Sequence, residues 1–434
     1  MNSDLPKVLH QIAGAPMLVH AMVTGAALQP DRTVIVAGHG AEAVTQAALA
    51  HDDTAQVVIQ TEQLGTGHAV RTALPALDGF AGKVFVLFAD TPFIRPETLE
   101  TMAAHPADVV VLGFQAKDPM RYGRLVVQDG AFQRIVEFKD ATPEERAITL
   151  CNSGMMAVEA GLLADLVRGL TNDNAAGEYY LTDIVAAARA KERSVAVVTC
   201  PEAETLGVNT RADLAAAEAT FQARARAEAL ENGVTLTAPD TVYFAWDTVV
   251  GRDAILHPNV FFGPGVTVES GAEIFPFTHL TGCHISRGAT VGPFARLRPG
   301  AELAEDVHVG NFVEIKNAIL DEGVKVGHLT YIGDASIGEQ TNIGAGTITC
   351  NYDGVMKHRT VIGKRVFIGS DTMLVAPVTV GDDAMTATGT VVTADVPAEA
   401  LAIARAKQDN KPGLAVRLME KLRAEKARRA KGNA

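Results

Sequence analysis

The sequence is poor in cysteine and in positive charge, and it has no long apolar run. Its four cysteines, Cys151, Cys200, Cys283 and Cys350, are far apart, with no CxxC pair and no histidine pair at zinc spacing. This usage argues against a disulfide framework and favours a reduced cytosolic protein. Because no run is long enough to span a bilayer and the first residues do not form a signal peptide, we expect a cytoplasmic protein without stable membrane insertion.

Basic residues are outnumbered, since 38 Lys and Arg face 51 Asp and Glu, for a formal net charge of −13. Such a balance argues against a nucleic-acid partner. The exception is the basic segment 421–431, KLRAEKARRAK. Two interpretations of it stay open, a solvated terminus or an arm that binds a partner or RNA.

A six-residue repeat occupies the second half of the chain. A helix of 3.6 residues per turn would spread this period around its surface, whereas a parallel β-helix uses six residues for one short strand and one corner. The repeat therefore predicts a solenoid with the aliphatic side chains inside, although the period does not give its hand. The anchors are Val250, Leu256, Phe262, Val268, Ile274, Leu280, Ile285, Val291, Leu297, Leu303, Val309, Ile315, Leu320, Val326, Ile332, Ile337, Ile343, Ile362, Ile368, Leu374, Val380, Thr386 and Val392. The candidate corners, with glycine expected to make the turn, are 251–253, 263–265, 292–294, 310–312 and 369–371.

The first half has a different pattern, in which short apolar runs alternate with helical stretches. Strands buried on both faces are expected at 33–37, 55–59, 84–88, 109–112 and 195–198, and helices at 17–28, 41–49 and 67–74. This alternation predicts an α/β domain with a parallel sheet. Doubly wound sheets normally open with a central strand, and none precedes the first helix here. A periodic, alanine-rich stretch from Arg211 to Glu231 predicts a connecting helix that stops at Asn232-Gly233.

Five strings carry a resemblance to one family. They are SDLPKVLH at 3–10, EQLGTGHA at 62–69, GEYYLTD at 177–183, GPFARLRPG at 292–300 and IGAGTITCNYDG at 343–354. Together they resemble the bacterial bifunctional enzymes that join an N-acetylglucosamine-1-phosphate uridyltransferase to a glucosamine-1-phosphate acetyltransferase. The similarity runs to about Gln408.

The resemblance implies a Rossmann-like nucleotidyltransferase domain followed by a left-handed parallel β-helix, assembled as a homotrimer with acetyl-transfer sites between protomers. It divides the chain into a pyrophosphorylase-like domain at 1–208, a linker helix at 209–231, an acetyltransferase domain at 232–395 and a C-terminal arm with a basic tail at 396–434. The co-substrates would be acetyl-coenzyme A and UTP, with Mg²⁺ as cofactor. The product would be UDP-N-acetylglucosamine, a cell-wall precursor.

Acetyl transfer to an amine needs a base, and His328 stands where most coils hold a small or turn residue. An imidazole can accept a proton at neutral pH, but the residue alone also fits a plain corner histidine. The resemblance implies the base. It further implies that the sugar phosphate is bound by Arg298, Lys316, Tyr331, Asn342, Asn351 and Lys357, and acetyl-coenzyme A by Ala345, Ser370, Thr388 and Arg405. No cysteine has the neighbouring base of a nucleophile, so direct attack on the thioester is expected.

For uridylyl transfer the resemblance implies Asp90 and Asn209 as magnesium ligands, a choice that suits the oxygen preference of this ion. It also places UTP and the sugar nucleotide against Lys7, Gln60, Gly65, Thr66, Gly123, Glu137, Asn152 and Asn209. Family members carry a strand and a glycine-rich phosphate loop before the SDLPK string, where Met1 stands here. We therefore expect that strand and loop to be missing and uridyltransferase activity to be weak or absent, while acetyl transfer survives.

Two rival interpretations remain at this point. Hexapeptide-repeat acyltransferases also act on other acceptors, which a panel of acetyl acceptors would distinguish. A non-catalytic solenoid would tolerate replacement of His328.

Overall fold

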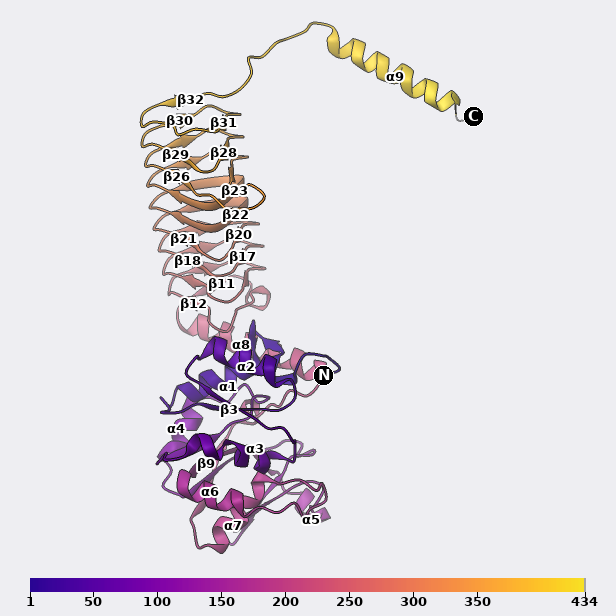
Figure 1. Cartoon of the computed structure of the whole chain (residues 1–434), viewed down its shortest axis with the longest axis vertical. Coiled ribbons are helices and arrows are strands. Elements are labelled where there is room, and N and C mark those ends of the chain that lie inside the picture. The colour runs from indigo at the N-terminus through magenta and orange to yellow at the C-terminus, as the bar shows by residue number, and fades with distance from the viewer. Residues whose placement is uncertain (433–434) are drawn as a thin grey trace. The chain divides into compact units, whose positions relative to one another are not determined.

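The computed structural model describes residues 1–432, with side chains as far as Arg429. It separates into two compact units (Figure 1). The first comprises residues 1–232, 238–248 and 261–265, and the second comprises 233–237, 249–260 and the residues from 266 on. The last residues of the expected C-terminal arm, 433–434, lie outside the described residues. Within residues 1–432 no helix is both long and apolar enough to cross a bilayer.

The first unit is built on a six-stranded mixed sheet with the path β10-β6-β9-β7-β8 and with β5 paired to β9. The strands are β5 (Lys83–Val86), β6 (Val109–Gln115), β7 (Arg124–Gln128), β8 (Ala131–Val136), β9 (Leu150–Glu159) and β10 (Val195–Cys200). The prediction of a purely parallel sheet is wrong, because β9 is antiparallel to both β5 and β6. Strand β9 is not among the predicted strands, because polar residues interrupt its apolar ones, and an apolar pattern reports burial but not direction.

Two further strands form a separate parallel pair, β3 (Val34–Ala37) with β4 (Gln56–Ile59). A hairpin of β1 (Gln11–Ile12) and β2 (Ala15–Pro16) precedes them. A cavity of about 700 Å³ lies between β3 and β5. The expectation that all strands are buried on both faces therefore holds for β6 but is wrong for β3 and β5, whose side chains line this cavity and are mostly half-buried. It is also wrong for β4 and β10, where most side chains are half-buried or exposed.

Helices flank these strands. They are α1 (Met17–Ala26), α2 (Ala41–His51), α3 (Thr66–Ala73), α4 (Pro96–Ala104), α5 (Pro143–Arg146), α6 (Ala160–Arg168), α7 (Ile184–Ala190) and α8 (Arg211–Glu231), with short 3-10 turns at 7–9, 74–77, 181–183, 202–204 and 239–241. The helices α1, α2, α3 and α8 lie where helices were predicted, whereas α4, α5, α6 and α7 were not predicted. The helix α8 begins at a capping box in which Thr210 and Asp213 bond each other's backbone N–H, and it ends at Asn232 as predicted.

The second half of the chain is a stack of short strands, β11 to β32, in one parallel ladder (Figure 1). The two longest are β22 (His308–Leu320) and β23 (Lys325–Ile337). Most others pair with the strand three further along, as β15 does with β18 and β16 with β19. The chain thus returns to the same face every three strands, so each coil has three sides. Beyond the stack lies α9 (Leu414–Gly432).

The remaining strands are β11 (Thr235–Leu236), β12 (Val249–Val250), β13 (Ile255–Leu256), β14 (Phe261–Phe262), β15 (Thr267–Val268), β16 (Glu273–Ile274), β17 (His279–Leu280), β18 (Cys283–Ile285), β19 (Thr290–Val291), β20 (Arg296–Leu297), β21 (Ala301–Leu303), β24 (Asn342–Ile343), β25 (Ile348–Cys350), β26 (Thr360–Ile362), β27 (Phe367–Ile368), β28 (Met373–Val375), β29 (Val378–Val380), β30 (Met385–Thr386), β31 (Val391–Val392) and β32 (Leu401–Ala402). The predicted anchors from Leu256 to Val392 are buried, and Val250 is half-buried.

Residues with left-handed backbone recur once per coil in three columns, which mark the three edges of the stack. The Phe294 edge holds Phe277, Phe294, Phe312, Leu329, Gly346, Asp371 and Gly389. The Asn317 edge holds Gly282, Gly300, Asn317 and Asp334. The Asp306 edge holds Asp253, Gly271, Gly288, Asp306, Gly323, Gln340, Arg365, Asp383 and Glu399.

Glycine makes the turn at only some of the corners: Gly265 and Gly292 have left-handed backbone, as the sequence suggested, but others do not. At Gly310 and Gly344 the backbone is not left-handed, and an added Cβ would collide with the backbone of the next coil. The positive φ falls two residues later, at Phe312 (57°) and Gly346 (77°). These two glycines therefore permit the coils to approach each other, and the turn itself is made by other residues.

Candidate active sites

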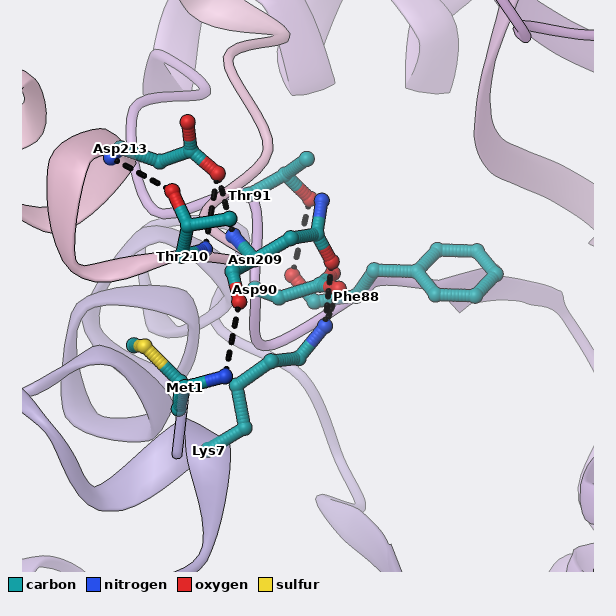
Figure 2. A network of polar contacts seen from close by, with 8 residues as sticks. All are labelled: Met1, Lys7, Phe88, Asp90, Thr91, Asn209, Thr210 and Asp213. Carbon is teal, nitrogen blue, oxygen red and sulfur yellow. Dashed lines mark hydrogen bonds and ion pairs between the residues drawn. The ribbon is translucent and has the colours of Figure 1, made fainter. Parts of the chain in front are cut away.

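Three of the predicted residues meet at the end of β5. Lys7 Nζ donates to Asp90 Oδ2 at 2.6 Å and to Asn209 Oδ1 at 2.9 Å, as Figure 2 shows. The main chain holds the two acceptors together, because Val208 N donates to the carbonyl of Asp90 at 2.9 Å. Asp213, from the capping box of α8, accepts from the backbone N–H of Asn209 at 2.9 Å. Two segments distant in sequence thus present one carboxylate and one amide oxygen to a single cationic nitrogen.

This pair of oxygens suits a hard divalent cation. Carboxylate and amide oxygens are ligands that Mg²⁺ accepts, and the ion usually takes one or two from protein and the rest from phosphate and water. Within residues 1–432 no cluster of three or more His, Cys, Asp or Glu side chains could hold a metal. The fit therefore depends on Asp90 and Asn209 with a phosphorylated substrate, and on displacement of Lys7 from between them.

A second group of predicted residues lies at the N-terminus of α3. Gln60 Nε2 donates to the carbonyl of Gly65 at 3.2 Å and contacts His68 Nδ1 at 3.0 Å. Thr66 Oγ1 accepts from the backbone N–H of Leu181 at 3.1 Å. Gly65 has φ 108°, and an added Cβ would lie 2.7 Å from the carbonyl oxygen of Tyr179. This close approach of two backbone segments is open only to glycine.

A third group surrounds Glu137. Asn152 N donates to the carbonyl of Gly123 at 2.8 Å, and an added Cβ on Gly123 would lie 3.4 Å from both oxygens of Glu137. Thr182 Oγ1 donates to Glu137 Oε1 at 3.1 Å. Burial is the main cause that raises the pKa of Glu137, and the nearby charges of Asp183 and Asp140 raise it further against the opposing Thr182 bond. The structure thus brings together all three residues predicted for the sugar.

The cavity between β3 and β5 adjoins the first two groups, since its lining includes Thr66, Leu181 and Asp90. Its walls are otherwise largely apolar, from Val34–Val36, Val84–Phe88 and α1. Such a lining holds few groups that could bind phosphate, so the polar residues at its rim are the ones suited to a nucleotide.

In the second unit the residues predicted for acetyl-coenzyme A form one column along the Phe294 edge. The exposed His328 precedes Leu329, whose carbonyl accepts from Gly346 N at 3.0 Å, so Ala345 lies one coil away. The carbonyl of Ala345 accepts from Asp371 N at 2.7 Å, and that of Ser370 accepts from Gly389 N at 2.8 Å. Arg405 Nη1 then donates to the carbonyl of Thr388 at 2.6 Å. The column therefore runs from His328 through all four predicted residues.

The residues predicted for the sugar phosphate gather at the Asn317 edge instead. The ladder pairs Lys316 with Gly333, next to Asp334, whose oxygens accept from Asn317 Nδ2 at 2.5 Å and from Asn351 Nδ2. The side chain of Lys357 beside it is the main cause that lowers the pKa of Lys316. Arg298 is paired with Glu314 at 2.8 Å.

Tyr331 lies on the face between these two edges, where it lines a shallow cavity of about 440 Å³ together with Phe312, Glu314 and Leu329. In a single chain His328 and Asn351 therefore stand at neighbouring edges rather than side by side. Asn342 lies on a different face, paired with Lys325 and Phe367, away from the other sugar-phosphate residues.

Sequence reasoning did not assign a role to two residues that the structure brings into these groups, Thr182 and Asp334. Thr182 stands inside the GEYYLTD string, so its signal was present. The sequence signal for Asp334 was weaker: it is a polar residue where the repeat shortens from six residues to five, between Ile332 and Ile337. Burial raises the pKa of the Cys350 thiol and raises those of Cys200 and Cys283 to about 12, so these sulfurs stay protonated and unsuited to nucleophilic attack.

Comparisons with known proteins agree with this architecture. Residues 1–230 match the family model described as the MobA-like NTP transferase domain. Residues 279–392 match the one described as the GMPPB C-terminal domain.

Among curated proteins, the bifunctional protein GlmU of Cereibacter sphaeroides (strain ATCC 17025) is 71% identical over 434 residues, which are 100% of this chain and 96% of the relative. That of a Ruegeria species (strain TM1040) is 68% identical over 100% of this chain and 97% of its own length. That of Paracoccus denitrificans is 66% identical over 98% of this chain and 96% of its own. With such identity across nearly the whole length, this chain belongs to the family of the bifunctional protein GlmU.

Proposed function

We propose that the chain is a bifunctional transferase that acetylates glucosamine-1-phosphate from acetyl-coenzyme A and then joins N-acetylglucosamine-1-phosphate to UTP, releasing UDP-N-acetylglucosamine and pyrophosphate. Uridylyl transfer is assigned to residues 1–208, acetyl transfer to residues 232–395, the helix 209–231 to the connection, and 396–434 to a C-terminal arm. The observation that carries the acetyl-transfer half is the column in which Ala345, Ser370 and Thr388 follow His328 along one edge.

In the acetyl-transfer site His328 is the general base. Its exposed imidazole takes a proton from the substrate ammonium, and the freed amine attacks the thioester carbonyl. The C–N bond forms as the C–S bond breaks, and coenzyme A leaves as the thiol. Because burial raises the pKa of Cys350, the sulfur next to Asn351, the transfer needs no acyl-enzyme.

The sugar phosphate is bound at the Asn317 edge. The nearby Lys357 lowers the pKa of Lys316, and an incoming phosphate would favour the charged form of this lysine. Arg298 adds a guanidinium once its pair with Glu314 opens. Tyr331, Asn342 and Asn351 are assigned to the sugar and its amine.

For uridylyl transfer a phosphate oxygen of the sugar substrate attacks the α-phosphorus of UTP, forming one P–O bond as the bond to pyrophosphate breaks. Mg²⁺, held by Asp90 and Asn209, supplies charge neutralisation for the phosphates when bound. Lys7 contacts a phosphate after leaving its place between these ligands. Gln60, Gly65 and Thr66 hold the uracil, while Gly123, Glu137 and Asn152 hold the N-acetylglucosamine.

The solenoid is proposed to be a left-handed β-helix that trimerises along the Phe294 edge. Phe277, Phe294 and Phe312 are each about half exposed and stack on one another at 4.9 and 5.4 Å between ring centroids. A continuous exposed apolar stripe of this kind favours a protein interface. A second copy against this edge could bring its own Asn317 edge next to His328, which one chain leaves apart. The cytoplasm is the proposed location.

The test is a pair of assays on the purified chain. Thiol release from acetyl-coenzyme A is followed with glucosamine-1-phosphate and, for comparison, with glucosamine, glucosamine-6-phosphate and serine. Pyrophosphate release is followed with UTP, Mg²⁺ and N-acetylglucosamine-1-phosphate. Preference for glucosamine-1-phosphate by at least tenfold in kcat/KM supports the acetyl-transfer half. Uridylyl transfer at a comparable rate supports the other half and contradicts the expectation of a weak or absent second activity. Faster acetylation of another acceptor, or no turnover, contradicts the proposal.

A further inference from the structure

Asp334 is a buried carboxylate that the mechanism above does not use. It is 8% exposed and makes the corner of β23 at the Asn317 edge with a left-handed φ of 49°. Asp is one of the few residue types other than glycine that tolerates this conformation. Since Asp is almost never buried without partners, its neighbours are informative.

Both oxygens of Asp334 accept from asparagine amides of the adjacent coils. Asn317 Nδ2 donates to Oδ1 at 2.5 Å, and Asn351 Nδ2 donates to Oδ2. An ionised carboxylate can only accept, so each amide must turn its NH₂ group towards Asp334 and its carbonyl oxygen away. Asp334 therefore decides which atom of Asn351 is left for a substrate, namely the acceptor Oδ1.

The carboxylate stays ionised. Burial by itself raises the pKa of Asp334, but the two amides and the charges of Lys316 and Lys357 together hold it below the usual value. Its charge in turn favours the charged form of Lys316, which the neighbouring Lys357 disfavours. Asp334 is thus the negative charge that counters the effect of Lys357 on Lys316.

The neighbouring residue adds a steric condition. An added Cβ on Gly333 would collide with Tyr331 Oη and would lie 2.9 Å from Asn351 Nδ2. Gly333 N also donates to Thr349 Oγ1 at 2.7 Å. The phenol, the amide and the carboxylate are therefore packed as one unit around a position without a side chain.

We propose that Asp334 is a positioning residue for the acetyl acceptor: it turns Oδ1 of Asn351 towards the substrate amine and holds Lys316 and Lys357 together for the phosphate. This inference rests on the proposed acetyl transfer. It assigns Asp334 no direct contact with the substrate.

The first test is Asp334→Asn, which keeps the shape and removes the charge. The kcat of acetyl transfer is expected to fall by about 10- to 100-fold, since small misplacement of a reacting group costs rate on this scale. The KM for glucosamine-1-phosphate is expected to rise several-fold while the KM for acetyl-coenzyme A is unchanged. The matched control is Asp306→Asn, an exposed aspartate with φ 56° at the Asp306 edge, which should match the wild type.

A double-mutant cycle separates positioning from a merely structural role. If Asp334 acts through Asn351, Asp334→Asn in an Asn351→Ala background should lower kcat by no more than twofold further. Asn317→Ala should leave kcat within threefold of the wild type. An equal loss of kcat from Asp334→Asn in both backgrounds would overturn the inference, and so would wild-type kinetics of the single variant.

Thermal unfolding and gel filtration show whether each variant folds. If Asp334→Asn does not fold, Asn351→Asp tests the same pair from the other side, because it keeps an outward acceptor oxygen and replaces the donor with a carboxylate that Asp334 repels. It is expected to lower kcat at least tenfold, and wild-type kcat would contradict the inference. Absence of acetyl transfer in the wild-type chain itself would instead count against the proposed function.

Discussion

Lys7 Nζ lies 2.6 Å from Asp90 Oδ2, in the position where a divalent cation bound by Asp90 and Asn209 would compete with it. The side chains of Lys7 and Asp90 are 37% and 29% exposed, so the ammonium can leave without unfolding its surroundings. The same lysine thus balances the charge of Asp90 and would be available to a phosphate when a cation is bound by Asp90 and Asn209.

Removal of Lys7 is therefore expected to strengthen binding of the metal alone. An ion pair as exposed as Lys7–Asp90 contributes at most about 1 kcal/mol of interaction free energy. Lys7→Met should therefore tighten Mn²⁺ binding about fivefold in the absence of nucleotide. Titration followed by electron paramagnetic resonance measures this affinity. Asp90→Asn should weaken it at least tenfold. Lys7→Met with unchanged Mn²⁺ affinity would contradict the proposed competition. The control is Lys83→Met, whose ammonium bonds to the carbonyls of Ala103 and His105.

Glu137 should lower stability at neutral pH. Burial is the main cause that raises its pKa above the ordinary 4.5, so the folded state binds this proton more tightly than the unfolded state does. The contribution of Glu137 to the free energy of unfolding is therefore most favourable below pH 4.5. It declines as the pH rises from 4.5 to the raised pKa of the folded state. Glu137→Gln should therefore raise Tm at pH 7.5 but not at pH 3.5, while binding of UDP-N-acetylglucosamine weakens. The exposed Glu97→Gln serves as control, and an equal gain in Tm at both pH values would refute this account.

Because of Asp353, the stability of the loop that carries Lys357 should respond to pH in the opposite sense. A hydrogen bond from His358 and then the backbone N–H groups of Met356 and Val355 lower its pKa from 3.8 to about 2. Because the pKa of Asp353 is lower in the folded state, its ionised carboxylate stabilises the loop fully well above pH 3.8. This stabilisation is lost as the pH falls from there to about 2. After correction for the intrinsic pH dependence of amide exchange, the protection of the His358 amide, which donates to the carbonyl of Asn351, should fall over this range. In Asp353→Asn the protection of the His358 amide should not change over the same pH range.

The Phe294 edge should control assembly. Phe294→Asp places a charge between Phe277 and Phe312 at a site already exposed in one chain, so the fold should persist while the proposed trimer dissociates. Light scattering would then report the mass of one chain, and acetyl transfer should fall at least 100-fold with uridylyl transfer retained. Ile319→Asp, at an equally exposed site on another face, should keep the trimer. A trimeric Phe294→Asp protein would place the interface elsewhere.

The solenoid was largely readable from sequence because each coil repeats the same local requirement. Even its irregularities were visible, since the five-residue steps from Leu280 to Ile285, from Ile315 to Leu320 and from Ile332 to Ile337 all fall at the Asn317 edge. The repeat did not predict which residue of each corner makes the turn. Phe312 was expected beside a glycine turn but makes the turn itself.

In the first unit the missing information concerned direction and long-range contacts. Strand β9 was not predicted, because Asn152, Ser153 and Gly154 interrupt its apolar residues, and its antiparallel place between β5 and β6 has no signal in the sequence period either. The three groups around Asp90, Gln60 and Glu137 were named only by resemblance. Their members come from distant segments such as Lys7 and Asn209, which no local pattern connects.

The most direct measurement of the central claim is the pair of turnover rates of His328→Ala beside the wild type. If His328 is the base, acetyl transfer should fall by about 100- to 10,000-fold, the range that a positioned base contributes. Uridylyl transfer and the trimer should be unchanged. Acetyl transfer by His328→Ala at the wild-type rate would contradict the account.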